Sequence, residues 1–231
     1  MRRHGDDVDG NPLRLLPQDG VIIPPMIAGI SIRARPVGSS PMRSFDPRAV
    51  GVLECRAWET YYRRKWAAFL AASVGMVRAA FRMNWPRTLV GAWLVLRANQ
   101  KWAPFPKNDP DAARALMTRF YRLLAASEGS SLDARRAAEL EVEWWRVHRE
   151  AQYDGRPESA EALAVALQEL YAYCYSVEPA AVRQAAALRA QAMEVSDRWV
   201  AAGHDPGDPL LVEERALLVR SYAALLAAVH R

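Results

Sequence analysis

The sequence predicts an all-α protein: a bundle of about seven helices, mostly antiparallel, with an extended or disordered N-terminal leader. Three observations support this fold class. Helix-start signals recur along the chain, most of them with an acidic residue followed by proline. No segment alternates polar and apolar residues with the period of two that a half-buried strand requires. The chain is also rich in alanine, leucine and arginine, which are good helix formers.

The first 45 residues differ from the rest of the chain. They contain six prolines and no helical period, so we expect a flexible or extended leader. Met42 immediately precedes the helical region, and one hypothesis is that the native protein starts there. Residues 46–231 are predicted to form a single α-helical domain, which is long enough to bury a substantial core.

Start and stop signals place the individual helices. Asp46-Pro47 puts a capping side chain before a proline at the first helical position, where its missing N–H costs nothing. The same pattern recurs at Trp85-Pro86, Asp109-Pro110, Glu178-Pro179 and Asp208-Pro209, and Asp133 and Ser159 are further capping candidates. Glycine, asparagine and proline supply the stops. The predicted helices are 47–83, 86–102, 110–127, 133–153, 159–176, 179–202 and 209–230.

Composition and missing motifs exclude several classes of protein. Hydrophobic residues make up 51% and charged residues 25%, as in an ordinary globular protein. The longest charge-free apolar run, Trp66–Val77, is too short for a bilayer, which needs about 20 residues. Cys55 and Cys174 lack the spacing of a disulfide framework or a zinc site, and such thiols suit a reducing cytoplasm. The sequence has no phosphate-binding glycine loop, serine-nucleophile motif or HExxH motif.

Positive charge is concentrated in residues 56–107, which carry 10 basic side chains and 1 acidic one. The predicted anion-facing residues are Arg63, Arg64, Lys65, Arg78 and Arg82. Tryptophans are interleaved with these cations. The combination is typical of nucleic-acid contact by phosphate binding and stacking, or of a helix at an anionic membrane surface. The alternative, which we favour, is a basic half that packs on the acidic half, or a solvated face with core tryptophans.

Seven residues are candidates for a ligand pocket because they share the apolar faces of their helices. They are Glu59 and Tyr62 in 47–83, Glu141, Trp144 and His148 in 133–153, and Arg189 and Asp197 in 179–202. A buried carboxylate needs a partner or a metal ion, and Glu59, Glu141 and His148 are the candidate metal ligands. The alternative is a structural network of ion pairs around a core histidine.

The Glu-x6-His spacing of Glu141 and His148 resembles the pair that one helix contributes in haem-oxygenase-like di-iron oxidases. That resemblance implies a seven-helix bundle, bound iron and oxidative chemistry. The chain departs from the family pattern, because those enzymes take further histidines from a late helix and 159–202 contains none. Two segments are similar to uncharacterised all-helical bacterial proteins, which implies no activity: AELEVEWWRVHRE (Ala138–Glu150) and LVEERALLVRSYAALLAA (Leu211–Ala228).

Three hypotheses of function follow. The first is a helical binding or interaction protein without chemistry of its own, which acts through an apolar pocket lined by the seven residues. The second is a metal-dependent oxidase, with iron as its cofactor. The third is a peripheral module that binds an anionic membrane or nucleic acid through residues 56–107. A homo-oligomer or a protein partner fits the first hypothesis, and an enzyme is the less favoured class.

Overall fold

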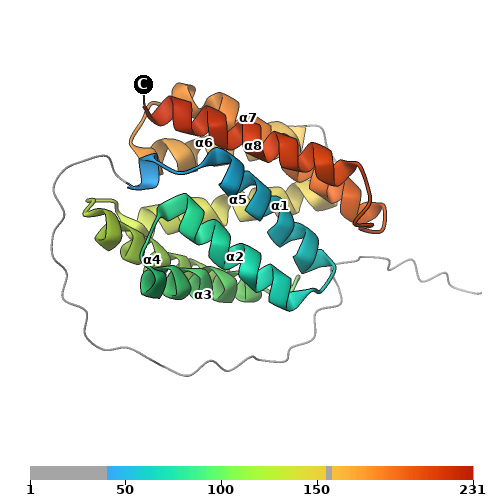
Figure 1. Cartoon of the computed structure of the whole chain (residues 1–231), viewed down its shortest axis with the longest axis horizontal. Coiled ribbons are helices and arrows are strands. Elements are labelled where there is room, and N and C mark those ends of the chain that lie inside the picture. The colour runs from blue at the N-terminus through green and yellow to red at the C-terminus, as the bar shows by residue number, and fades with distance from the viewer. Residues whose placement is uncertain (1–40, 155–157, 231) are drawn as a thin grey trace, which may run out of the picture.

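The computed structural model of the chain describes residues 41–154 and 158–230 (Figure 1). A short 3-10 helix, η2 (Pro41–Arg43), precedes eight α-helices. Their bounds are α1 (Pro47–Tyr62), α2 (Trp66–Phe81), α3 (Trp85–Trp102), α4 (Pro110–Glu128), α5 (Ala134–Asp154), α6 (Glu158–Tyr175), α7 (Pro179–Ala201) and α8 (Leu210–Val229). The described residues form no strand, so the predicted all-α class is confirmed.

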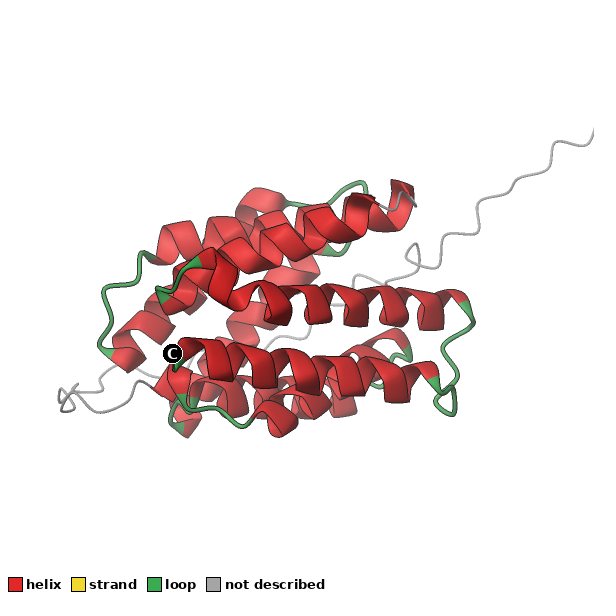
Figure 2. Cartoon of the chain, turned by 90° about the horizontal axis from the view of Figure 1, so that it is seen from above, coloured by secondary structure: helices red, strands yellow, loops and turns green. Residues whose placement is uncertain are grey.

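The helices form a closed ring of neighbours. Each helix packs against the next one in the sequence, and α8 returns to pack against α1. Figure 1 shows α7 and α8 along one side of the molecule and α3 and α4 along the opposite side. Figure 2 shows short loops that join the helices at both ends. The contact between α2 and α3 is the smallest one in the ring, so α3 is attached mainly through α4.

Side-chain caps form at several of the predicted helix starts, whereas the side chain of Glu178 makes no capping hydrogen bond at the start of α7. Asp46 accepts hydrogen bonds from two backbone N–H groups in the first turn of α1. Asp109 and Asp133 cap α4 and α5 in the same way. The cap predicted at Trp85 is wrong by one residue, because the side chain of Asn84 accepts the hydrogen bond at the start of α3.

The predicted first helix, 47–83, is wrong in its length, because the structure divides it into α1 and α2. The break is a Schellman turn: the N–H of Lys65 donates to the carbonyl of Thr60 (2.8 Å), and the N–H of Arg64 donates to that of Tyr61 (3.0 Å). Arg64 adopts the left-handed conformation, with φ of 58°, which glycine or asparagine usually supplies. An arginine in this position carries no stop signal. The described chain therefore has eight α-helices where the sequence predicts seven.

Residues 41–45, assigned to the leader from the sequence, pack against the bundle. Met42 and Phe45 are buried in the main core. The guanidinium of Arg43 donates to the last carbonyl groups of α6 and α8. The domain boundary predicted at Asp46 is therefore too late. Residues 41–45 contribute apolar contacts to the core, but the segment is too short and irregular to show a periodic pattern in the sequence. The rest of the predicted leader lies outside the described residues.

Two hydrophobic cores lie side by side. The main core contains residues from all eight helices, including Phe120, Leu167 and Leu225. A separate set, which we call the small core, lies where α7 leads into α8. It consists of Cys55, Ala192, Trp199, Leu211 and Leu218.

Helices α1 and α8 approach closely at Gly51. A Cβ atom at this position would lie 2.7 Å from the backbone nitrogen of Val219 and 2.9 Å from its Cα. Neither atom can move unless α8 shifts, so this contact requires glycine.

Gly51→Ala is expected to lower the free energy of unfolding by about 1–3 kcal/mol, because the added methyl group overlaps backbone atoms. Gly75→Ala in α2 is the matched control. The nearest atom there is the side-chain Cδ2 of Leu53 at 3.2 Å, which can rotate away, and alanine favours the helix by up to about 1 kcal/mol. Urea unfolding measures both variants. Equal stabilities would contradict the close approach of α1 and α8.

Candidate functional site

A buried ion pair joins α1 to α7 across the interior. The Nη2 of Arg189 donates to Oε1 of Glu54 at 2.7 Å, and the two side chains are 12% and 4% exposed. The Tyr222 hydroxyl on α8 donates to Oε2 of Glu54 at 2.6 Å, and Arg189 Nη1 donates to the Tyr171 hydroxyl on α6 at 3.3 Å. Buried charges need such partners in place of water. These four residues, the central cluster, tie four helices together.

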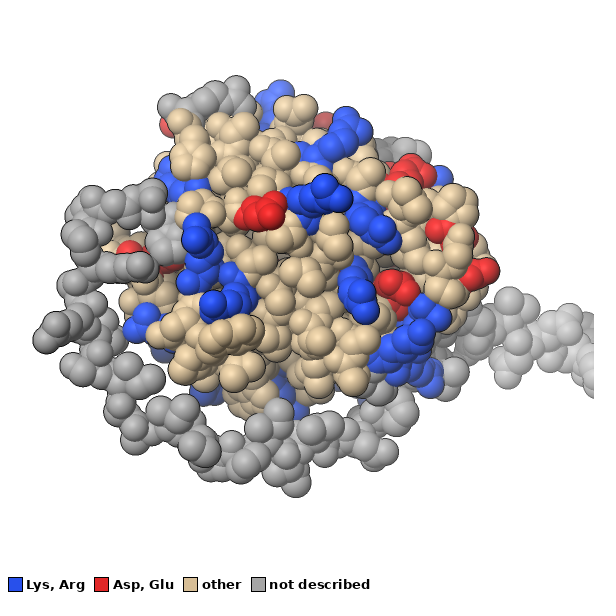
Figure 3. All heavy atoms as spheres, viewed as in Figure 1, with Lys and Arg blue, Asp and Glu red and all other residues tan. Residues whose placement is uncertain are grey.

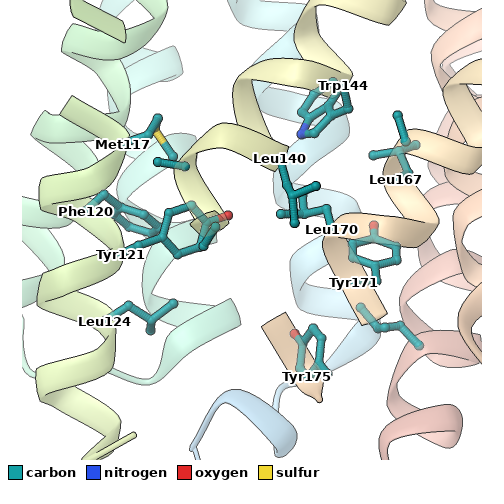
Figure 4. Packing of buried hydrophobic residues seen from close by; sticks show 14 of the residues in the cluster. Met117, Phe120, Tyr121, Leu124, Leu140, Trp144, Leu167, Leu170, Tyr171 and Tyr175 are labelled. Atoms are coloured by element: carbon teal, nitrogen blue, oxygen red, sulfur yellow. The ribbon is translucent and has the colours of Figure 1, made fainter. Parts of the chain in front are cut away.

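Glu141 on α5 lies next to the central cluster. The hydroxyl of Tyr121 donates to Oε2 of Glu141 at 2.8 Å. Figure 4 shows the Tyr121 side chain reaching from α4 towards α5. Burial raises the pKa of Glu141, and the positive charge of Arg189 opposes that rise. The Arg189 guanidinium carbon also lies 5.1 Å from the ring centroid of Trp144. Arg189 thus acts on two carboxyl groups, Glu54 and Glu141, at once.

A second polar group links α5 to α7 nearer the surface. The Nε2 of His148 lies 3.0 Å from Oδ2 of Asp197, and the side-chain amide of Gln152 donates to Oδ1 of Asp197 at 2.7 Å. The His148 and Asp197 side chains are 21% and 31% exposed. These two hydrogen bonds join α5 to α7 through the carboxylate of Asp197.

Two of the seven predicted ligand residues, Glu59 and Tyr62, lie near the C-terminal end of α1. Oε1 of Glu59 pairs with Nη1 of Arg63 one turn further along, at 2.7 Å, so Glu59 stays outside both interior groups. The ring of Tyr62 packs on Trp199, with 6.3 Å between centroids. Burial and the nearby charge of Asp197 raise the pKa of Tyr62, which places Tyr62 with the Asp197 group.

The structure does not bring the three candidate metal ligands together. Glu59, Glu141 and His148 each have a different partner. Across 41–154 and 158–230, no three His, Cys, Asp or Glu side chains gather closely enough to hold a metal ion. Two shallow cavities of about 420 and 440 Å³ open between α5 and α6 and beside η2. None of the seven residues lines either cavity.

Glu214 on α8 is a buried carboxyl group outside the predicted set. It is 1% exposed, and its Oε2 has no hydrogen-bond partner within the described structure. Burial, followed by the negative charge of Glu54, raises the pKa of Glu214 to about 8 from an ordinary value of 4.5. The sequence contains a signal for it: Glu214 follows Leu211 by three residues and precedes Leu218 by four, so all three share one helix face.

The solvent face of α3 is apolar. Trp85, Leu89, Val90 and Trp93 are 56%, 54%, 46% and 36% exposed. Their spacing places them along one side of the helix, and we call this set the docking face. The buried side of α3 is made mostly of small residues: Thr88, Gly91, Ala92, Leu94 and Ala98.

Cations flank the docking face at both of its ends. Arg82 and Arg87 lie near its start, and Arg97 and Lys101 follow its end. Within the described ranges none of the four pairs with a carboxylate, and the sequence has no acidic residue from 60 to 108. Figure 3 shows the side of the molecule that includes α1, α2 and α8, where blue Lys and Arg side chains outnumber red acidic ones.

The five predicted anion-facing residues divide into two kinds. Arg64, Lys65 and Arg82 are exposed. Arg63 pairs with Glu59, and the guanidinium of Arg78 lies over the ring of Trp85. The first three therefore present their charge to solvent, whereas the other two also serve contacts within the protein.

Arg189→Met is expected to lower the free energy of unfolding by about 3–5 kcal/mol, because it leaves the Glu54 carboxylate buried without its cation. Arg63→Met removes a more exposed pair and is the matched control, with an expected loss below about 1 kcal/mol. Adding Glu54→Gln to Arg189→Met removes the unpaired charge and is expected to restore part of the loss. Urea unfolding of the three variants tests this. A double variant no more stable than Arg189→Met would contradict the pairing.

No protein-family model matches the chain, and no curated protein or solved structure is significantly similar to it. Among the described helices, none is long and apolar enough to cross a membrane.

Proposed function

We propose that the protein binds peripherally to anionic membrane surfaces, with α3 lying in the interface between water and lipid. One observation carries this proposal: the bulky apolar residues of α3 face solvent, and cations stand at both ends of that face. A helix of this kind places its apolar residues among the upper acyl chains and keeps Lys and Arg level with the lipid phosphates. Tryptophan is enriched at this depth because its ring has an apolar body and a polar N–H.

The outward position of the docking face follows from the packing of α3 on α4. At Gly91 a Cβ atom would already lie 3.2 Å from the Met83 side chain and 3.4 Å from the ring of Phe120 on α4. Small residues on this side let α3 lie close to α4, where the Phe120 ring fills the space. The larger residues of the docking face are therefore left on the solvent side.

Trp85 is held in place although it is more than half exposed. The guanidinium carbon of Arg78 lies 4.3 Å from its ring centroid, and Arg78 Nη1 donates to the carbonyl of Met83 at 2.9 Å. The cation–π contact orients the ring. An aromatic side chain that is already ordered loses less conformational entropy when it enters an interface, which favours binding.

The aliphatic residues of the docking face favour a membrane over a nucleic acid as the partner. Basic and aromatic surfaces bind nucleic acids through phosphate contacts and base stacking, and neither contact uses Leu89 or Val90. A lipid interface buries both residues. Each cation near an anionic membrane contributes about 1 kcal/mol, so Arg87, Arg97 and Lys101 together contribute about 3 kcal/mol.

The double change Leu89→Ser and Trp93→Ser is expected to weaken binding to vesicles of phosphatidylglycerol and phosphatidylcholine about tenfold or more, because it removes apolar area from the interface. Co-sedimentation at several lipid concentrations measures the affinity. The matched control is Val165→Ser with Val212→Ser, which removes exposed apolar residues (48% and 64% exposed) from α6 and α8. Equal loss of binding in both double variants would count against a specific role for α3.

The double change Arg97→Gln and Lys101→Gln is expected to weaken binding to the same vesicles roughly 30-fold, since it removes two interfacial cations. The matched control is Arg183→Gln with Arg220→Gln, which removes two exposed cations from α7 and α8. It has the same net charge as the first double variant but should bind like the unchanged protein. Vesicles of phosphatidylcholine alone should bind weakly, and added salt should weaken binding to the anionic ones. Stronger binding to an oligonucleotide than to anionic vesicles would overturn the proposal.

A further inference from the structure

The first half of α8 is attached differently from its second half. Leu211 and Leu218 belong to the small core, whereas Leu225 and the residues after it belong to the main core. The small core contains few residues and is separate from the main one. An element held by few buried apolar contacts can open while the rest of the protein stays folded.

Glu214 lies on the small-core face of this half-helix, and polar groups from several helices surround it. They are Glu54, Cys55 and Tyr62 on α1, Ser196 and Asp197 on α7, and Arg215 on α8, while His148 on α5 acts through its pair with Asp197. The two carboxylates among them, Glu54 and Asp197, already bind Arg189 and His148. Oε2 of Glu214 has no hydrogen-bond partner among the described residues.

Ionised Glu214 would therefore face two carboxylates whose own partners, Arg189 and His148, are already engaged. The hydroxyl of Ser196 and the charge of Arg215 favour the ionised form, but Arg215 is exposed to solvent and its charge is screened. Burial and Glu54 outweigh them. The folded protein consequently prefers a protonated Glu214.

We infer that Glu214 is a pH-sensitive attachment point: the proton on its carboxyl group decides whether the first half of α8 stays docked against α1 and α7. Loss of the proton places an unpaired charge beside Leu211 and Leu218. Release of the half-helix returns that charge to water and opens the small core, including Cys55 and Trp199. The second half of α8 remains in the main core.

The direction and range of the effect follow from the two pKa values. In the docked state the pKa of Glu214 is about 8, and in water it is 4.5, so the docked state binds more protons between these values. Docking is therefore most favourable below about pH 4.5 and weakens as the pH rises through neutrality. Within this window the equilibrium constant for opening rises about tenfold per pH unit, and above about pH 8 it levels off.

Hydrogen exchange of the intact protein tests this inference. After correction for the intrinsic exchange rate, the backbone amides of 211–218 should show an opening constant that rises about tenfold per pH unit between about pH 5 and about pH 8. The amides of α5, which lie in the main core, should not follow this rise. In Glu214→Gln the rise should disappear, because the amide has no proton to lose over this range.

Glu213→Gln is the matched control, since Glu213 is the exposed neighbour of Glu214 and pairs with Arg198 at the surface (3.5 Å). It should keep the pH dependence of the unchanged protein. The rate at which a thiol reagent labels Cys55, divided by its rate with a free thiol of the same reactivity, gives a second measure of opening. It should rise with pH in the unchanged protein and in Glu213→Gln, but not in Glu214→Gln. A rise that persists in Glu214→Gln, or that is equal in 211–218 and α5, would overturn the inference.

Discussion

The ion pair between Arg189 and Glu54 is the interaction on which the interior depends. It joins α1 to α7 across the ring of helices, and its tyrosine partners bring α6 and α8 into the same group. The guanidinium of Arg189 acts on two carboxyl groups, Glu54 and Glu141. Glu54 takes its closest contact, and burial dominates at Glu141 and Glu214, whose pKa values rise. Glu54 thus connects the two effects, because its carboxylate holds the cation of Arg189 and its negative charge adds to burial in raising the pKa of Glu214.

The outer surface follows a different constraint, which is the close packing of α3 on α4. Small residues occupy most of the contact, and the residues of the docking face, which are Trp85, Leu89, Val90 and Trp93, are left outside. A surface helix normally shows the reverse arrangement, with its large apolar residues turned inward. The exposed apolar stripe therefore needs an explanation beyond folding. The membrane binding proposed above supplies one, because an anionic bilayer is apolar in its interior and negatively charged at its surface, where the flanking cations would lie.

Much of the fold could be predicted from local signals. Capping aspartates at positions 46, 109 and 133 fix helix starts because their side chains bond the first free N–H groups whatever the tertiary context. The break between α1 and α2 could not be predicted, since Arg64 adopts a conformation that its side chain does not favour. The candidate site was predicted only in part: His148 and Asp197 do pair, whereas Glu59 bonds along its own helix.

The sequence by itself determined where most helices begin and end, because capping and helical period act within a few residues. It also determined the concentration of positive charge in 56–107. Only the tertiary structure decided which face of each helix is buried, because burial depends on neighbours distant in the sequence. Trp85 and Trp93 of α3 on the one hand, and Glu214 of α8 on the other, show the two outcomes. Packing on α4 turned apolar residues towards solvent, and packing between α1 and α7 enclosed a carboxyl group that a surface helix would have left in water.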